Sequence, residues 1–474
     1  MGMWGASRGG FQRGAAAAAV VLVAAACAVA AAWVHFPGHV SMDSSMQLWE
    51  AWLGESVTWN PPSMSAMLRW LGPGAEGAGR MMALNTVATY LALAGTGAVM
   101  LLVRAGASRK WGWIAAGLVA LVVLNPILFL YVGIVWKDVL FSTLMLAGAA
   151  LGLVACILEG RGKWVAALAS VVVLAFGMKV RQQGIFVAPT LALVPVIAVA
   201  WGASGRSTAA RNAALVLLVF VASAWSASRM VAATIHTPPQ FGNQVGLQGV
   251  MQYDTSGIVA FSTTPTDAFP IPMNDRLRAE VQRVYSVDRG DFQWTSPAVT
   301  QWLSAPGYAG VKQRWRTLVA NEPGAYLAHK LGAFRSLMNV DGVKACLPIH
   351  VGMVGHDENL RQIGIEPGLD RHDQRIYGWS QRIIRWPLYR HWVYAVALLV
   401  AGVVVMAGLR RSRLKWGLVA VGVATALLYA SYLPTSIACD FRYLFPAICL
   451  VSLVWIVLVV ELTGPGSRWA GKHE

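Results

Sequence analysis

The sequence contains few charged residues. Of its 474 residues only 13% are Asp, Glu, Lys or Arg, and 56% are hydrophobic. Soluble domains carry about a quarter charged residues. The few charges sum to a formal net charge of +16. In a soluble chain this excess would suggest nucleic acid, but at this hydropathy the question is which side of a bilayer holds the Lys and Arg residues. The composition predicts an all-α polytopic membrane protein without a nucleic-acid partner.

Motifs for metal and nucleotide sites are also absent. The chain contains no H-E-x-x-H, no CxxC pair, no G-x-x-x-x-G-K-[ST] and no G-x-G-x-x-G. Its five cysteines show no metal-ligand spacing. ATP is therefore not expected to drive this protein. No cofactor is required, although Asp43 and Asp138 leave a divalent metal open.

The long apolar runs predict about ten transmembrane helices. A helix needs roughly 20 apolar residues to cross the hydrocarbon core. The runs lie near 14–34, 83–103, 112–132, 139–158, 164–179, 185–201, 212–233, 391–409, 415–433 and 444–461. The first is predicted to be a retained signal anchor, because no small-residue cleavage site follows it.

The basic residues predict the orientation. The connections at 104–110, 159–163, 201–211 and 409–415 are short and basic, and ten spans place them on one face together with both termini. By the positive-inside rule this face is the cytoplasm. We therefore predict a multi-pass membrane protein with both termini in the cytoplasm.

This topology divides the chain into three parts. Residues 1–233 form an N-terminal transmembrane module whose first extracytoplasmic loop is 35–82. Residues 234–390 form a mixed extracytoplasmic domain, which is long enough to fold on its own. Residues 391–474 form the C-terminal transmembrane helices and a cytoplasmic tail. In the middle part, helices are expected at 274–285, 310–321 and 323–339, the last as an amphipathic helix on the membrane surface.

Two cysteines, Cys346 and Cys439, fall on the predicted outer face. That compartment is oxidising in bacteria. We predict a disulfide between them, with two free thiols as the alternative.

The first candidate site residue is Asp43, about nine residues after the first span. On a helix Asp43 and Gln47 would share a face, because they are four residues apart. Taken alone, Asp43 followed by two serines is also typical of a helix N-cap.

Further charged residues occur where other spans meet the outer face. Lys137 and Asp138 lie at the mouth of the fourth span, where ionisable groups usually face a cavity or a partner. A snorkelling lysine with a capping aspartate is the alternative. Arg181 lies in a basic turn that the positive-inside rule disfavours, and a guanidinium can clamp a phosphate. Asp440 and Arg442 precede the last span, where an interfacial anchor is the alternative. Together they place carboxylates and cations on one membrane face.

The motifs that carry these residues resemble a known family. P-G-H-V-S-M-D-S-S-M-Q, W-N-P-P, V-W-K-D-V-L-F-S, V-R-Q-Q-G and D-F-R-Y-L-F-P occur in the order seen in bacterial membrane glycosyltransferases of the GT-C superfamily. This superfamily includes the protein O-mannosyltransferases and the aminoarabinose transferase of lipid A. The resemblance runs from Phe36 to about Pro446, and 234–390 carries no matching motif.

The resemblance implies a GT-C type fold and roles for individual residues. It also implies that the protein lies in the bacterial cytoplasmic (inner) membrane with its active site extracytoplasmic. Asp43 would be the catalytic base. The partners would be a polyprenyl-phosphate-linked sugar donor and a glycan, lipid or protein acceptor. Where relatives often have His-Pro-Pro this chain has Asn60, which could supply only hydrogen bonds. The substrate-binding candidates are Gln47, Asn60, Lys137, Asp138, Arg181, Gln182, Asp440 and Arg442, of which Lys137, Arg181 and Arg442 would hold the phosphate.

Two other functions remain open. An O-antigen polymerase or ligase would use a diphosphate-linked glycan. A lipid-linked glycan transporter or flippase would use the same charges as a substrate path. Against a transporter, the charges cluster at one face and no inverted repeat is visible.

Overall fold

A computed structural model describes residues 3–72, 74–104, 109–239, 244–342 and 345–464. Within these ranges the chain is helical, and its only β-structure is isolated bridges. Eight helices are long and apolar enough to cross a membrane, and a bent pair makes a ninth. The predicted all-α polytopic fold is confirmed.

The ten predicted runs all fall on helices of the bundle. The bundle helices are α1 (Met3–His35), α4 (Ala75–Arg104), α5 (Arg109–Val123), α6 (Pro126–Val132), α7 (Lys137–Ile157), α8 (Gly160–Gly177), α9 (Gly184–Ala200), α10 (Arg206–Thr234), α18 (His391–Gly408), α19 (Arg413–Thr435) and α20 (Phe445–Leu462). The third run is the bent pair, in which the direction of α6 differs from that of α5 by 45°. Pro126 cannot donate a backbone hydrogen bond, and Asn125 caps the new helix by accepting from the Ile127 N–H at 3.0 Å. The sixth run is α9, which has only 17 residues.

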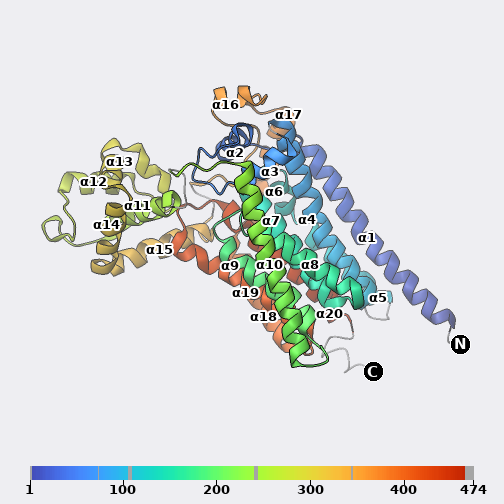
Figure 1. Ribbon diagram of the computed structural model, residues 1–474. Coiled ribbons are helices and arrows are strands. Elements are labelled where there is room, and N and C mark those ends of the chain that lie inside the picture. Colours follow the sequence, from blue (N-terminus) through green and yellow to red (C-terminus); the bar gives the residue numbers. More distant parts are fainter. Residues whose placement is uncertain (1–2, 73, 105–108, 240–243, 343–344, 465–474) are drawn as a thin grey trace.

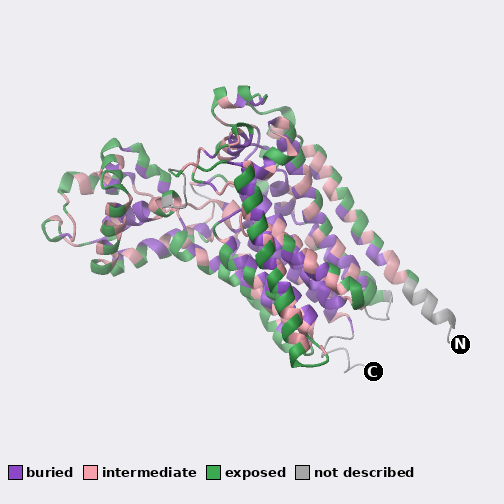
Figure 2. Cartoon of the chain, in the orientation of Figure 1, coloured by how far each residue is buried: buried purple, intermediate pink, exposed green. Residues whose placement is uncertain are grey.

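Two helices form the centre of the bundle. Most residues of α7 and α20 are buried, whereas α1, α10 and α18 leave most of theirs uncovered (Figure 2). The uncovered residues are largely apolar, such as Leu22 and Leu399, as expected of a surface that faces lipid.

Short helices cover one end of the bundle, which we call the capped end. They are α2 (Met42–Leu53), α3 (Ser63–Leu71), α16 (Asp357–Gln362), α17 (Arg371–Ile383) and the single turns η4 (Pro387–Tyr389) and η5 (Phe441–Leu444). Figure 1 shows α2, α3, α16 and α17 together at this end. Helix α1 begins and helix α20 ends at the opposite end of the bundle. Helix α2 stops at Gly54, whose left-handed φ of 80° suits glycine.

A lobe lies to one side of the bundle (Figure 1). It consists of α11 (Gln244–Phe261), η2 (Thr266–Ala268), α12 (Asp275–Val284), η3 (Gly290–Thr295), α13 (Pro297–Ser304) and α14 (Gly307–Asn321), and α15 (Pro323–Leu337) leads from it to the bundle. The three helices expected in this region are present as α12, α14 and α15. The position of α15 on the membrane surface stays a prediction. The lobe has its own apolar core, in which Ile258, Val281 and Leu318 are fully buried.

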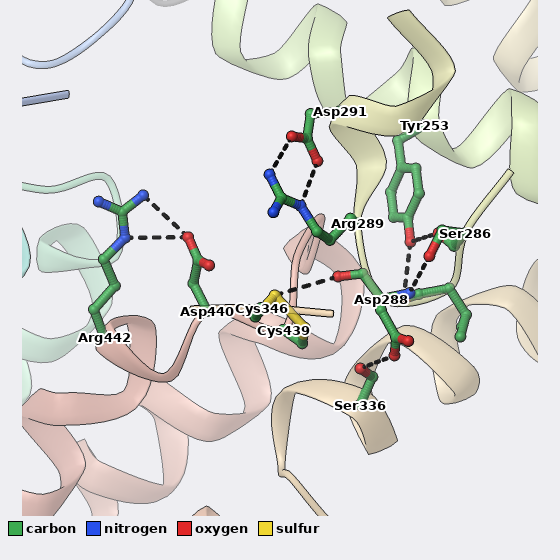
Figure 3. Close-up of a disulfide and its surroundings, with 11 residues drawn as sticks. Tyr253, Ser286, Asp288, Arg289, Asp291, Ser336, Cys346, Cys439, Asp440 and Arg442 are labelled. Atoms are coloured by element: carbon green, nitrogen blue, oxygen red, sulfur yellow. Dashed lines mark hydrogen bonds and ion pairs between the residues drawn. A yellow bond between two sulfur atoms is a disulfide. The ribbon is translucent and has the colours of Figure 1, made fainter. Parts of the chain in front are cut away.

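The lobe is fastened to the segment between α19 and α20. Next to this contact Cys439 forms a disulfide with Cys346, which lies in the loop after α15, and this is the pairing predicted from the sequence (Figure 3). Beside it the Cys439 N–H donates to the Asp288 carbonyl at 2.8 Å, and the Gly290 N–H donates to the Ile437 carbonyl at 2.8 Å. The segment that carries Asp440 and Arg442 is therefore held by both the lobe and the bundle.

Candidate active site

Four segments that are distant in sequence meet at the capped end. They are the first turn of α2, the first turn of α7, the turn between α8 and α9, and η5 with the residue before it. They bring together three carboxylates and three cations, namely Asp43, Asp138, Asp440, Lys137, Arg181 and Arg442.

Arg442 lies at the centre of this cluster. Its Nη2 is 2.7 Å from Asp43 Oδ2 and 3.0 Å from Asp440 Oδ2, as Figure 3 shows for Asp440. Its Nε is 3.9 Å from Asp138 Oδ2. The guanidinium also lies 4.7 Å above the Trp136 ring, a favourable cation–π geometry. One side chain of 14% exposure thus links three carboxylates.

Arg181 and Asp138 form a buried ion pair. Their side chains are 6% and 0% exposed. Arg181 also lies 4.8 Å from the Tyr443 ring centroid. Asp138 is in the first turn of α7, where the helix dipole favours a negative charge. Asp138 is therefore not simply a helix cap, because it neutralises a buried guanidinium.

Asp43 is the most accessible acid of the cluster. Its side chain is 43% exposed, against 25% for Asp440 and 0% for Asp138. Burial opposes ionisation of the Asp43 carboxyl, but the charges of Arg442, Lys137 and Arg181 outweigh it, so its pKa lies below the usual value. The carboxylate is ionised at neutral pH and partly open to a ligand.

The alternative interpretation of Asp43 as an N-cap is wrong. Helix α2 begins at Met42 with Ser41 as its N-cap, and Asp43 is the second helical residue. Its carboxylate turns to Arg442 instead of to the backbone of its own helix.

Lys137 is held differently from the two arginines. Its Nζ donates to Asn60 Oδ1 and lies 4.8 Å from the Trp59 ring centroid. The side chain is only 7% exposed, so a lysine that snorkels to water is wrong.

The two predicted glutamines differ. Gln47 is buried one turn after Asp43, and its Nε2 has no hydrogen-bond partner among the described residues. Gln182 is exposed, and within the described part of the chain no side-chain hydrogen bond joins it to the cluster. A substrate-binding role for Gln182 stays a prediction.

Sequence reasoning missed Glu50. This fully buried residue of α2 accepts hydrogen bonds from the Val57 and Thr58 N–H groups and from the hydroxyls of Thr58 and Ser65. It follows Asp43 by seven residues and Gln47 by three, so helical periodicity places all three on one face. That spacing could have identified it.

The described residues contain no group of three or more His, Cys, Asp or Glu side chains arranged to hold a metal ion. At the site the carboxylates instead surround guanidinium groups.

Comparisons with known proteins give little help. No family model and no curated protein matches the chain. A solved structure that matches is the archaeal oligosaccharyltransferase AglB from Archaeoglobus fulgidus in complex with an inhibitory peptide and a dolichol-phosphate. The identity is 12% and the TM-score 0.38, over 92% of this chain and 50% of that one. The chain thus spans half the length of AglB. A likeness at this level does not establish function, which has to come from the residues of the site.

Proposed function

We propose that this chain is an integral membrane glycosyltransferase of the GT-C type. It moves a sugar from a polyprenyl-phosphate donor to an extracytoplasmic glycan, lipid or protein acceptor. The observation that supports this most is the partly exposed, ionised Asp43 directly beside buried cations at one end of a membrane bundle. These are the groups needed to accept a proton and to bind an anionic leaving group.

The cations would bind the donor phosphate. Lys137, Arg181 and Arg442 lie at or next to the ends of apolar helices. A phosphate bound there would leave the prenyl chain in the bilayer. As the glycosidic bond breaks, negative charge grows on the phosphate, and preorganised cations stabilise it. No divalent metal is needed for this step.

Asp43 would take the proton from the acceptor. The acceptor oxygen bonds to the anomeric carbon as the carbon–phosphate oxygen bond breaks. The hydroxyl proton passes to Asp43, and polyprenyl phosphate leaves with the electron pair. Direct displacement inverts the anomeric centre. A bound phosphate competes with Asp43 for Arg442, which frees the carboxylate for the acceptor hydroxyl.

The orientation follows from the basic connections. They assign the capped end to the outside of the cytoplasmic membrane and both termini to the cytoplasm. An enzyme that faces outward has no access to cytoplasmic nucleotide sugars, so a lipid-linked donor is the natural substrate.

Substituting Asp43 tests this function. Asp43→Asn keeps the size of the side chain but removes the base, so we expect transfer to fall by about 10²–10⁴. Transfer would be measured with reconstituted protein and a panel of polyprenyl-phosphate sugars. Glu76→Gln is a matched control, because Glu76 is an exposed carboxylate paired with an arginine in the first turn of α4.

Full activity of Asp43→Asn would overturn the proposal. Transfer only from diphosphate-linked glycans would favour a polymerase or ligase instead. Movement of the lipid-linked sugar across the bilayer without transfer would favour a flippase.

A further inference from the structure

Lys137 stands apart from the other two cations of the site. Arg181 is paired with Asp138, and Arg442 with Asp43 and Asp440. In the described part of the chain, the Lys137 ammonium contacts a neutral amide and an aromatic ring. An ammonium has three N–H donors, so Lys137 retains donors for an incoming oxygen. A phosphate that binds Lys137 does not have to displace a carboxylate, so the position of the Lys137 ammonium determines where such a phosphate can bind.

That position is set by a chain of hydrogen bonds that starts at Glu50. Glu50 Oε1 accepts the Thr58 hydroxyl proton at 2.7 Å. A hydroxyl has one proton, so towards any other neighbour Thr58 Oγ1 can only accept. The neighbour is Asn60, whose Nδ2 donates to it at 3.2 Å.

The orientation of the Asn60 amide follows. With its NH₂ group turned to Thr58, Asn60 presents Oδ1 to Lys137, and Lys137 Nζ donates to that oxygen. In the opposite orientation the amide would point N–H groups at an ammonium. Glu50 and Asn60 are 0% and 6% exposed, so water does not readily substitute for these bonds.

We propose that Glu50, Thr58 and Asn60 are positioning residues that orient one amide and thereby hold Lys137 as the anchor for the donor phosphate. The identity of the ligand rests on the proposed function. The orientation of the amide and its effect on Lys137 do not. Asn60 thus has a defined task in the place where relatives often carry histidine.

The same carboxylate provides a matched control. Its second oxygen, Oε2, accepts the Ser65 hydroxyl at 2.5 Å, and Ser65 makes no bond to Asn60. Ser65→Ala therefore removes a buried hydrogen bond of Glu50 without touching the path to Lys137. Thr58→Val removes the path, and Thr58→Ser retains it.

The experiment measures the reactivity of Lys137 in the full-length protein in lipid nanodiscs. Acetic anhydride labels the amine over a range of pH, and mass spectrometry quantifies acetylation at this residue. The hydrogen bond to Asn60 stabilises the charged ammonium of Lys137, and its loss destabilises that form by a factor of about ten. We expect Thr58→Val to accelerate labelling by about that factor, with Thr58→Ser and Ser65→Ala unchanged.

A rescue variant tests whether Thr58→Val accelerates labelling only because the loop around Thr58 loses its structure. In Asn60→Asp both side-chain oxygens accept, so orientation no longer matters. Adding Thr58→Val to Asn60→Asp should leave Lys137 as protected as in Asn60→Asp alone. Equal labelling of Thr58→Val and wild type, equal acceleration by Ser65→Ala, or failure of the rescue would each overturn the inference.

Transfer assays distinguish this inference from the proposed function. For an active enzyme we expect Thr58→Val to raise the donor KM and to lower kcat, because Lys137 would bind the phosphate and also stabilise the charge that grows on it. Thr58→Ser should restore both parameters. If labelling behaves as expected but no lipid-phosphate sugar is transferred, the positioning chain stands and the glycosyltransferase proposal fails.

Discussion

Asp43 owes its ionisation to its neighbours more than to its exposure. Burial works against the charged carboxyl, and Arg442 is the nearest of the cations that reverse this effect. Its pKa is therefore lowered, and Asp43, the proposed base, stays ionised below the usual pKa of aspartate, about 3.9.

The pH profile should show this lowering. If transfer needs ionised Asp43, the acid limb of kcat/KM should lie below about pH 3.9 in the wild type. In Arg442→Gln the largest lowering influence is gone and burial remains, so the acid limb of the residual activity should move to higher pH. The check is kcat/KM against pH for both proteins. If the acid limb has the same position in both proteins, Arg442 does not lower the pKa of the group that acts as base.

Several site residues could be predicted from their position alone. Asp43, Lys137, Asp138, Arg181 and Arg442 stand out because charges are rare and each follows or precedes an apolar run. Their pairing could not be predicted. Whether Arg181 meets Asp138 or Asp43 depends on how α7 and α8 are rotated, which the order of residues does not determine. Glu50 escaped notice because its partners lie in an irregular loop.

At the scale of elements, the lobe contains a second buried polar network. Asp254 on α11 accepts from Trp315 Nε1 at 2.9 Å and from His329 Nε2 at 3.2 Å, and it pairs with Lys330. His329 Nδ1 is 2.7 Å from the Tyr285 hydroxyl. Each member of this network has partners and no metal group surrounds it in the described residues, so it serves to join α11, α14 and α15.

The close approach of His329 to α11 needs a glycine. A Cβ on Gly257 would lie 2.2 Å from His329 Nδ1. We expect Gly257→Ala to destabilise the lobe by about 1–3 kcal/mol, the usual effect of overpacking. Limited proteolysis of the lobe measures this. Gly249→Ala in the same helix is the control, because no atom lies within 4 Å of its Cβ position and the variant should be neutral or stabilised. Equal sensitivity of the two variants would contradict the assignment.

At the scale of the molecule, the lobe and the site share the segment between α19 and α20. The Cys346–Cys439 disulfide ends one residue before Asp440 and three before Arg442. Opening the disulfide releases the loop after α15 from this segment and loosens the backbone that carries the central guanidinium.

We expect the double variant Cys346→Ser/Cys439→Ser to bind the donor several-fold more weakly and to lose protease protection in the loop after α15. Removal of a native disulfide commonly costs about 2–5 kcal/mol. Cys27→Ser is the control, since Cys27 is a free thiol of α1. Unchanged donor affinity after reduction of the wild type would show that the link does not support the site.

The bundle was predictable to a greater extent than the site. All ten apolar runs are found on helices because the cost of exposing a backbone to hydrocarbon leaves few alternatives. The break between α5 and α6 could be read from Asn125-Pro126. The lobe was harder, because short polar helices have no such constraint and their packing depends on partners such as Gly257 and His329.

The burial of α20 also bears on how the protein is made. This helix is the last of the described spans and lies at the centre of the bundle, and the turn before it carries Arg442. The spans before α20 are synthesised first, so they enter the membrane before the central helix against which they pack. Asp43 and Asp138 emerge long before Arg442, the guanidinium that links them. Until α20 and the turn before it are inserted, Asp43 therefore lacks the guanidinium that pairs with it, and the charge cluster is incomplete.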